Sequence, residues 1–298
     1  AATWRSYQWA GVDIGDRQGR FWGVPFTKKD RMRSGLIDFV SNRRRVSAFS
    51  FNEHDLYKYH TVMQRFNPRY FYGYVSMIAE FADFLKRSGQ QSDYDLNAII
   101  TTSEELTSYH RSLIETVFST KVYNEYGCGE VGTIAFECEH EALHVMAENV
   151  LVEIYDGERR CENGEVGEIV VTELNNYAMP LIRYRLGDYA VLSPRMCACG
   201  RTLPVLENIY GREYDIIRNR EGRLFHGEYF MYIFEDIQKN GLGVKAFQVR
   251  QRHLDEFHIK IVPEEGYGII TENLIRDKVR ADFGKETKVE IEITDQIP

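Results

Sequence analysis

The sequence is short of cysteine and of long apolar runs, and both shortages narrow the class of protein. Five cysteines in 298 residues form too sparse and too odd a set for a disulfide framework. No apolar run approaches the roughly 18 residues that a membrane span requires, and the first residues, Ala1 to Arg5, do not resemble a signal peptide. These features predict a protein of the reducing cytoplasm with no membrane partner.

A clustered basic face is also missing from the sequence. Lys and Arg number 37 against 45 Asp and Glu, so the net charge is −8 and the pI is near 5.6. Proteins that bind nucleic acid usually carry a basic patch or stripe. The one compact basic run, Arg43 to Arg45, is too short for that and is typical of a solvated loop or a helix end. We therefore expect no nucleic-acid partner.

Apolar residues, by contrast, are plentiful enough for a substantial core. At 43% hydrophobic and 13% aromatic residues, the chain can form two domains or one large one. Up to about residue 120, short apolar runs typical of buried strands alternate with helical spacing. We expect strands at 20–24 and 96–100, and helices at 77–85 and from about 103 to 118. This pattern favours a layered α/β domain.

Strand-like alternation dominates the next part of the chain, from residue 143 to 172. Nearer the C-terminus, alternating runs at 245–250, 257–262 and 289–293 flank an amphipathic stretch at 273–283. The fold class is therefore α/β, with a layered α/β N-terminal domain that carries a β-rich subdomain, followed by a small α+β C-terminal domain.

One stretch, from Tyr123 to Glu130 (YNEYGCGE), packs aromatic, glycine and carboxylate residues into eight positions. Its glycines suit a loop that lets the backbone approach a ligand closely. Taken alone, the stretch is equally typical of a glycine-rich turn between a helix and a strand. Two further stretches follow it in order, Arg183 to Asp188 (RYRLGD) and Gly211 to Asp215 (GREYD).

Together these three stretches resemble the adenylate-forming enzymes, the superfamily of acyl-CoA synthetases. Four shorter segments are most similar to its phenylacetate-CoA ligase and capsule-biosynthesis branch: Glu137-Cys138, Leu143-His144-Val145, Cys199-Gly200-Arg201-Thr202 and Phe247-Gln248-Val249. The resemblance covers nearly the whole chain. It implies a large domain at 1–210, with its β-rich subdomain at about 143–209, and a small domain at 211–298.

The resemblance implies a role for each residue of the first motif. Tyr126 would stack on adenine beside Gly127, and Glu130 would hold the Mg²⁺ that bridges the phosphates of ATP. Glu130 is otherwise typical of a solvated loop carboxylate. The family usually has Thr or Ser before this glutamate, and Gly129 here lacks that hydroxyl, which puts phosphate handling in doubt.

The second and third motifs would complete the nucleotide site. By resemblance, the two oxygens of Asp188 would accept hydrogen bonds from the ribose hydroxyls, whereas an Asp after Gly187 is also common in a turn. Arg212 would contact ribose or phosphate as a catalytic residue, and is otherwise an ordinary exposed linker arginine. Tyr214 and Asp215 leave the hinge position of the family unassigned.

The loop after the strand at 96–100 borders the acyl-substrate pocket in the family. Thr102, Ser103 and Glu104 are therefore candidates for the pocket wall, although starting the following helix explains all three. Similarly, Ser76 sits where it would cap the helix at 77–85.

Cysteine and histidine positions suggest a second, structural metal site. Cys197 and Cys199 supply two thiolates, and Cys138 with His144 or His140 completes a tetrahedral set if the strands bring the loops together. The spacing is not that of a C-x-x-C knuckle, and buried free cysteines are ordinary core residues. A structural Zn²⁺ is therefore a hypothesis beside that alternative.

Two parts of the family pattern do not occur in this sequence. The Ser/Thr/Gly-rich phosphate loop and the catalytic lysine near the C-terminus are not found, so we expect a segment of a longer protein. Its function is then either an ATP-dependent carboxylate-activating ligase that uses coenzyme A, or a non-catalytic nucleotide-binding or scaffold protein. The partner would be a small-molecule carboxylic acid of unassigned identity, and a homodimer stays an open option.

Overall fold

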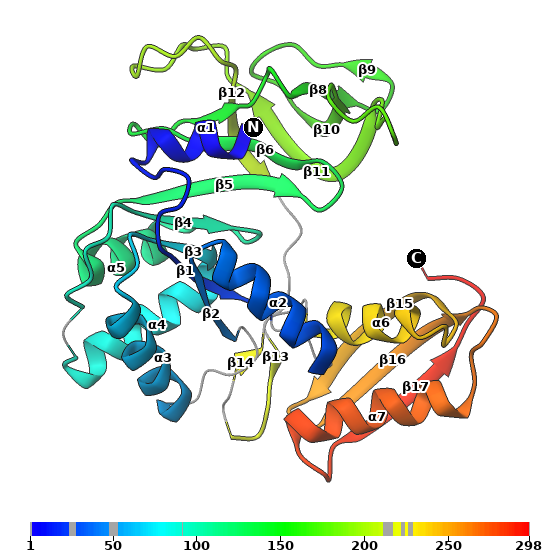
Figure 1. Ribbon diagram of the computed structural model, residues 1–298. Helices are drawn as coiled ribbons and strands as arrows, with labels where there is room; N and C mark the ends of the chain where they lie inside the picture. The colour runs from blue at the N-terminus through cyan, green and yellow to red at the C-terminus, as the bar shows by residue number, and fades with distance from the viewer. Residues whose placement is uncertain are drawn as a thin grey trace. The chain divides into compact units, whose positions relative to one another are not determined.

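The computed structural model describes residues 2–23, 28–47, 53–90, 92–210, 217–221, 224–225 and 229–297, which divide into two compact units (Figure 1). The first unit comprises Ala1–Trp22, Ile37–Val46 and Leu56–Glu213. The second comprises Gly23–Leu36, Ser47–Asp55 and Tyr214–Pro298. Each unit is described by itself below.

A mixed sheet of 12 strands organises the first unit, in the order β2-β1-β3-β4-β5-β6-β7-β12-β11-β10-β8-β9. The strands are β1 (Gln18–Trp22), β2 (Arg43–Ser47), β3 (Tyr70–Tyr74), β4 (Ala98–Thr102), β5 (Val122–Cys128), β6 (Gly132–Glu137), β7 (Leu143–Val145), β8 (Val150–Asp156), β9 (Arg159–Arg160), β10 (Val166–Glu173), β11 (Tyr184–Leu192) and β12 (Val205–Tyr210). The helices are α1 (Ala2–Trp9), α2 (Lys28–Val40), α3 (Glu53–Phe66), α4 (Val75–Ser88) and α5 (Ser108–Phe118). Both α2 and α3 begin in segments that cluster with the second unit.

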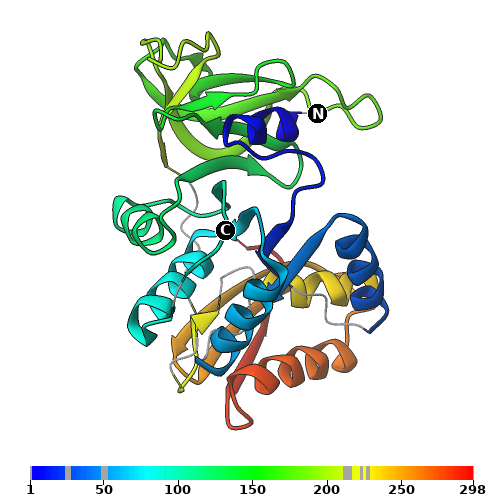
Figure 2. The same ribbon diagram turned by 60° about the vertical axis from the view of Figure 1, so that its left-hand side comes forward.

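Strand direction divides this sheet at β5. Strands β1, β3, β4 and β5 pair in parallel, whereas β5 pairs with β6 antiparallel, as do the strand pairs that follow. The parallel strands are buried on both faces, since one face packs on α4 and α5 and the other on α1 (Figures 1 and 2). The expected layered α/β fold with a β-rich part is therefore confirmed.

Helix α4 shows why the sequence pattern predicted its position. Its apolar positions, among them Ile78, Phe81 and Leu85, fall on one face and are at most 1% exposed. Gly89, at φ 64°, ends the helix in the left-handed conformation and donates its N–H to the Leu85 carbonyl. The strand expected at 20–24 begins two residues earlier, and Arg43 to Arg45 lie in β2, not in a loop or a helix end.

The second unit is a small α+β structure, as expected. It contains β13 (Ile217–Arg218), β14 (Leu224–Phe225), α6 (Tyr229–Lys239), β15 (Val244–His253), β16 (Glu256–Pro263), α7 (Ile269–Phe283) and β17 (Lys288–Ile293). Helices α6 and α7 cover one face of the β15-β16-β17 sheet (Figures 1 and 2). Phe257 of β16 joins them, because its ring meets both Phe230 of α6 and Phe283 of α7.

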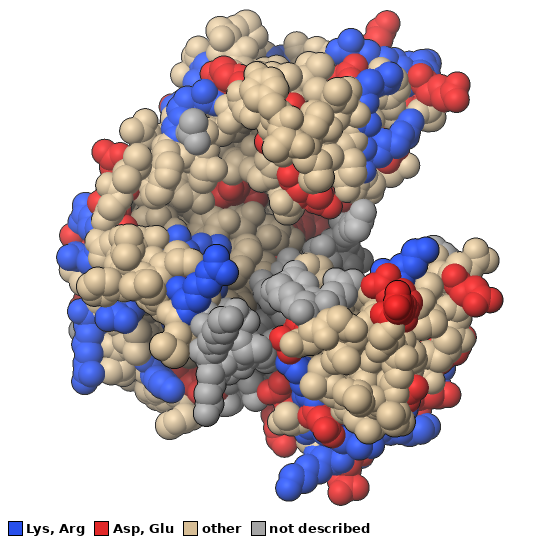
Figure 3. Space-filling view, turned by 45° about the vertical axis from the view of Figure 1, so that its right-hand side comes forward, with Lys and Arg blue, Asp and Glu red and all other residues tan. Residues whose placement is uncertain are grey.

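Two surface features bear on function. Among the described helices, none has both the length and the apolar character that crossing a bilayer requires. On the face drawn in Figure 3, lysines and arginines are interspersed with aspartates and glutamates. That face carries no uniformly basic surface of the kind that binds a phosphate backbone.

Candidate nucleotide and metal sites

The first motif is a strand, not the loop that its glycines suggested. Tyr123 to Cys128 lie within β5, and only Gly129 to Val131 form the turn into β6. Gly127 is required for packing, because a Cβ there would lie 2.2 Å from the carbonyl oxygen of Gly132. At Gly129 no heavy atom lies within 4 Å of such a Cβ. A side chain at position 127 would therefore clash with the neighbouring strand, whereas position 129 has room for one.

Tyr126 and Asp188 are brought into direct contact by the sheet. The Tyr126 hydroxyl donates to Asp188 Oδ2 at 2.8 Å, and burial together with this carboxylate raises the pKa of Tyr126, so the hydroxyl keeps its proton. Asp188 lies within β11, not in a turn. The β10–β11 register shifts between Glu168 and Val170, so Leu186 to Asp188 form a bulge, with Gly187 at φ 80°.

Glu130 lies in the exposed β5–β6 turn and has a partner that the sequence did not reveal. The Tyr184 hydroxyl, at the start of β11, donates to Glu130 Oε1 at 3.1 Å. Tyr184 belongs to the second motif, so its place beside Asp188 in the sequence was an available signal. The two motifs thus meet through Tyr126 with Asp188 and through Tyr184 with Glu130. Arg212 and the neighbouring Tyr214 and Asp215 lie outside the described residues.

The residues expected at the acyl pocket have different local roles. Thr107, not Thr102 or Ser103, caps α5 by accepting the His110 N–H at 3.2 Å. Glu104 instead binds the start of α4: its carboxylate accepts the Ser76 N–H at 2.6 Å and the Ser76 hydroxyl at 2.9 Å.

Ser76 itself is not a cap. The N-cap position of α4 belongs to Tyr74, whose side chain makes no capping bond. The negative charge of a carboxylate at a helix N-terminus also interacts favourably with the positive end of the helix dipole. Pocket lining by Thr102, buried at the end of β4, and by exposed Ser103 remains a prediction.

Four potential metal ligands converge at the end of β6. The ligand atoms of Cys138, His144, Cys197 and Cys199 all lie within 4.8 Å of one another. Cys138 Sγ lies 3.7 Å from Cys197 Sγ, and Cys199 Sγ lies 3.2 Å from His144 Nε2. Three thiols and an imidazole match a Cys₃His set for tetrahedral Zn²⁺.

Contacts around this cluster are those that hold metal ligands in place. The Nδ1–H of His144 donates to the Leu203 carbonyl at 3.2 Å, which leaves Nε2 as the ligand atom. Each sulfur accepts a backbone N–H from two residues ahead: Cys138 from His140, Cys197 from Cys199, and Cys199 from Arg201. His140 thus contributes only its backbone N–H to these contacts, and the imidazole among the potential metal ligands is that of His144. Burial raises the pKa of the Cys138 thiol to about 11, a cost that a bound cation would offset.

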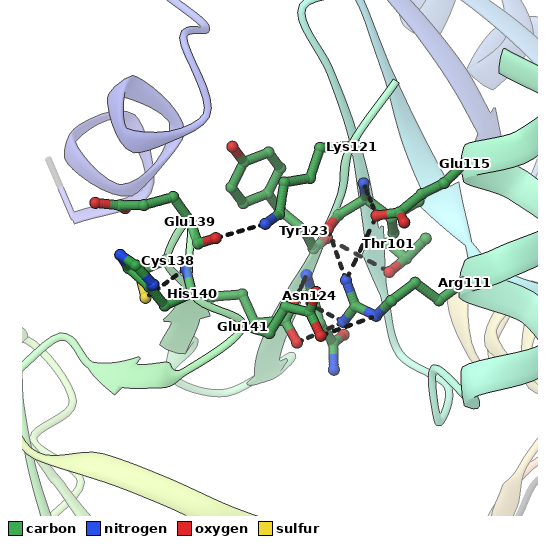
Figure 4. A network of polar contacts seen from close by, with 12 residues as sticks. Thr101, Arg111, Glu115, Lys121, Tyr123, Asn124, Cys138, Glu139, His140 and Glu141 are labelled. Carbon is green, nitrogen blue, oxygen red and sulfur yellow. Dashed lines mark hydrogen bonds and ion pairs between the residues drawn. The ribbon is translucent and has the colours of Figure 1, made fainter. Parts of the chain in front are cut away.

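A partly buried ion pair ties this end of β6 to β5 and α5 (Figure 4). The Arg111 guanidinium binds both oxygens of Glu137, at 2.6 and 2.8 Å, and donates to the Val122 carbonyl at 2.8 Å. Glu137 Oε2 also accepts the Asn124 N–H at 2.9 Å, and Glu115 accepts the Val122 N–H. Since Cys138 follows Glu137, the cysteine and histidine cluster and the strand that carries Tyr126 share the support of this ion pair.

Curated relatives are similar to most of this chain. A phenylacetate-coenzyme A ligase of Thermus thermophilus is 29% identical over 217 residues, which cover 69% of this chain and 47% of that protein. Protein CapK of Staphylococcus aureus is 25% identical over 181 residues, covering 60% of this chain and 39% of the relative. Residues 217–298 match the model of the CapK C-terminal domain.

These similarities support a phenylacetate-CoA ligase-like branch of the adenylate-forming enzymes as the family of this chain. The chain spans about half the length of the curated relatives it matches, or less.

Solved structures agree on the fold. A 2-hydroxyisobutyryl-CoA ligase bound to 2-HIB-AMP and CoA superposes on 99% of this chain and 67% of its own, with a TM-score of 0.57 and 20% identity. An open conformation of the same ligase gives a TM-score of 0.55 at 19% identity, over 99% of this chain and 69% of its own. This chain thus shares the fold of these ligase structures.

Proposed function

We propose that the full-length gene product is an ATP-dependent acid-CoA ligase. The substrate carboxylate attacks the α-phosphorus of ATP, which forms an acyl-adenylate and releases pyrophosphate. The thiol of coenzyme A then attacks the acyl carbonyl, forms the thioester and releases AMP. Both steps depend on positioning and on neutralising charge more than on covalent help from the protein.

The contact between Tyr126 and Asp188 carries this proposal, because it unites two motifs that lie 62 residues apart. The Tyr126 ring, beside Gly127, binds the adenine, and Asp188 accepts the ribose hydroxyls with the lone pairs that Tyr126 leaves free. Glu130, held by Tyr184, binds the Mg²⁺ of the nucleotide, and Arg212 contacts ribose or phosphate.

The cysteine and histidine cluster has a separate, structural role in this proposal. Cys138, His144, Cys197 and Cys199 hold a Zn²⁺ that fixes the β6–β7 turn to the loop before β12. A fully occupied Cys₃His set leaves no open coordination position for substrate.

Calorimetry with Mg²⁺-AMP tests the nucleotide site directly in this chain. We expect Asp188→Ala to weaken binding at least tenfold, because each hydrogen bond to a charged group contributes about 1.5–3 kcal/mol. The matched control is Asp156→Ala, an exposed aspartate at the end of β8 in the same sheet, which should bind like the wild type. Equal binding by wild type and Asp188→Ala would contradict the assignment.

Activity is tested on the full-length gene product. Pyrophosphate release that depends on an added carboxylic acid, followed by thioester formation with coenzyme A, would support the ligase. Nucleotide binding without pyrophosphate release across a broad acid panel would instead favour a non-catalytic nucleotide-binding protein.

A further inference from the structure

Arg20 occupies a position that none of the motifs explains. Strand register places Arg20 opposite Tyr72 of β3. Two residues further along the strands, a row of side chains crosses the sheet, formed by Trp22, Tyr74, Thr102 and Glu125. This row crosses the carboxyl ends of β1, β3 and β4 and the middle of β5. Because side chains alternate along a strand, Arg20 lies on the sheet face opposite Phe21, whose ring packs on Phe81 of α4.

Aromatic rings surround the Arg20 guanidinium. Its carbon lies 4.8 Å from the Trp22 ring centroid and 5.1 Å from that of Tyr72. Trp22 also stacks on Tyr74, with centroids 4.3 Å apart and planes 14° apart. These contacts hold the cation in a defined place without neutralising its charge.

Among the described residues, no salt bridge or hydrogen bond joins Arg20 to a carboxylate, although the Arg20 charge acts on nearby Glu125 and counteracts the rise in the pKa of that carboxyl. Arg20 Nε is buried and has no hydrogen-bond acceptor, and the described residues form no ion pair with Arg20. The carboxylate of Glu125, on the same face, is already bound by the Tyr7 hydroxyl at 2.8 Å and the Thr133 hydroxyl at 2.6 Å.

Neighbouring strand β2 adds positive charge and a second unmet donor. Arg43 Nε is also buried without an acceptor among the described residues, and Asp38 pairs with both Arg43 and Arg45. Burial lowers the pKa of Arg20, Tyr72 acts in the opposite direction, and the charges of Arg43 and Arg45 lower the pKa further. The corner formed by β1 and β2 is therefore electropositive.

Such a corner is suited to an anion. A buried donor without an acceptor destabilises the folded chain, and a bound carboxylate would satisfy it. A guanidinium presents parallel donors that match the two oxygens of a carboxylate. In open α/β sheets, ligands bind beyond the carboxyl ends of the parallel strands, and Trp22, Tyr74 and Thr102 of this row lie at those ends.

We propose that Arg20 binds a second carboxylate of the acid that this site activates, so that the substrate class is dicarboxylic acids. This inference rests on the proposed function, since it assumes that the other carboxylate reaches the nucleotide near Asp188. Arg20 then selects the substrate, and Trp22 and Tyr72 hold its guanidinium in position.

Paired ligands test this selection by calorimetric titration into this chain. Succinate, glutarate, adipate, suberate and 4-carboxyphenylacetate are each compared with their monomethyl ester, which keeps the length and removes one charge. We expect at least one diacid to bind tenfold or more tightly than its ester. Arg20→Gln should remove that preference and leave binding of the ester within about twofold, as expected for a lost charge-assisted bond.

Two further variants separate recognition from folding. Arg20→Lys keeps the charge and should retain part of the preference, whereas Arg87→Gln, an exposed arginine of α4, should retain all of it. The inference is overturned if no diacid is preferred over its ester, or if Arg20→Gln weakens the diacid and the ester equally.

Mg²⁺-AMP titrations distinguish this failure from failure of the proposed function. AMP binding that depends on Asp188, without a diacid preference, would overturn the role of Arg20 alone. A diacid preference that depends on Arg20, without AMP binding, would support the anion site and contradict the proposed nucleotide site.

Discussion

The hydroxyl of Tyr126 donates to Asp188 Oδ2 at 2.8 Å, across 62 residues of sequence. Tyr126 comes from β5, the last parallel strand, and Asp188 from a bulge in antiparallel β11. The bond therefore joins the two halves of the sheet at the candidate nucleotide site. Burial and the Asp188 carboxylate raise the pKa of Tyr126, so its hydroxyl keeps the proton that it donates in this bond.

Tyr126 variants should separate the effects of its ring and its hydroxyl. Tyr126→Phe keeps the stacking face and loses one hydrogen bond that orients Asp188, so Mg²⁺-AMP affinity should fall about fivefold, from about 1 kcal/mol. Tyr126→Ala also loses base stacking, worth about 1–3 kcal/mol, and should bind still more weakly. Calorimetry measures both, and equal affinities for the two variants would contradict a stacking role.

Two glycines of the first motif form a matched pair for stability. In Gly127→Ala the new methyl meets the Gly132 carbonyl oxygen, so we expect a loss of about 1–3 kcal/mol or more. Gly129→Ala adds a methyl in open space at an exposed position and should change stability by less than about 0.5 kcal/mol. Urea denaturation of both variants tests the difference. Gly129→Thr, which introduces the hydroxyl usual in the family, should fold equally well.

Metal analysis should find about one Zn²⁺ per chain after purification without added metal. Cys199→Ser should lose the metal, and the melting temperature should fall by several degrees, since 1 kcal/mol corresponds to about 2–4 °C in a domain of this size. Cys161→Ser is the control, because Cys161 lies outside the cluster and should keep both metal and stability. Protein without bound metal whose stability is insensitive to Cys199→Ser would show that the thiols are ordinary core residues.

Removal of the Glu104 carboxylate should destabilise the start of α4. Glu104→Ala loses the bonds to the Ser76 N–H and hydroxyl, so the free energy of unfolding should drop by about 1–2 kcal/mol. Glu105→Ala, at an exposed neighbour in the same loop, serves as the control. The affinity of folded Glu104→Ala for a carboxylic acid tests whether Glu104 also lines the acyl-substrate pocket. An affinity equal to that of the wild type would mean that Glu104 serves only the helix.

Buried Glu125 should make stability depend on pH. Desolvation raises its pKa above the ordinary value of about 4.5, although hydrogen bonds from Thr133 and Tyr7 and the charge of Arg20 oppose the shift. The folded state then binds more protons than the unfolded state, so stability falls as pH rises through this raised pKa. The slope for one group is at most about 1.4 kcal/mol per pH unit.

Glu125→Gln should remove this dependence. The variant cannot ionise, so its stability relative to the wild type should increase with pH above about 4.5 and level off above the folded-state pKa. Denaturation curves between pH 5 and 8 measure the difference. A constant gap between the two proteins over that range would show that Glu125 is ionised throughout.

The sequence by itself determined several of the elements and indicated the family. Helix α4 follows from apolar residues at helical spacing, and the strands of the β-rich part follow from alternation, since both periods are local properties of the chain. The three ordered motifs were sufficient to indicate the adenylate-forming superfamily. Cys138, Cys197 and Cys199 were likewise recognised as possible metal ligands from the sequence alone.

Tertiary structure decided which of these residues meet. Sheet register set Tyr126 against Asp188 and His144, not His140, beside the thiols, and neither follows from sequence spacing. Glu104 caps a helix that precedes it by many residues, against the local expectation that it would start the next one. Contacts of this kind depend on how strands that are distant in the sequence align, and the local spacing of apolar residues carries no information about that alignment.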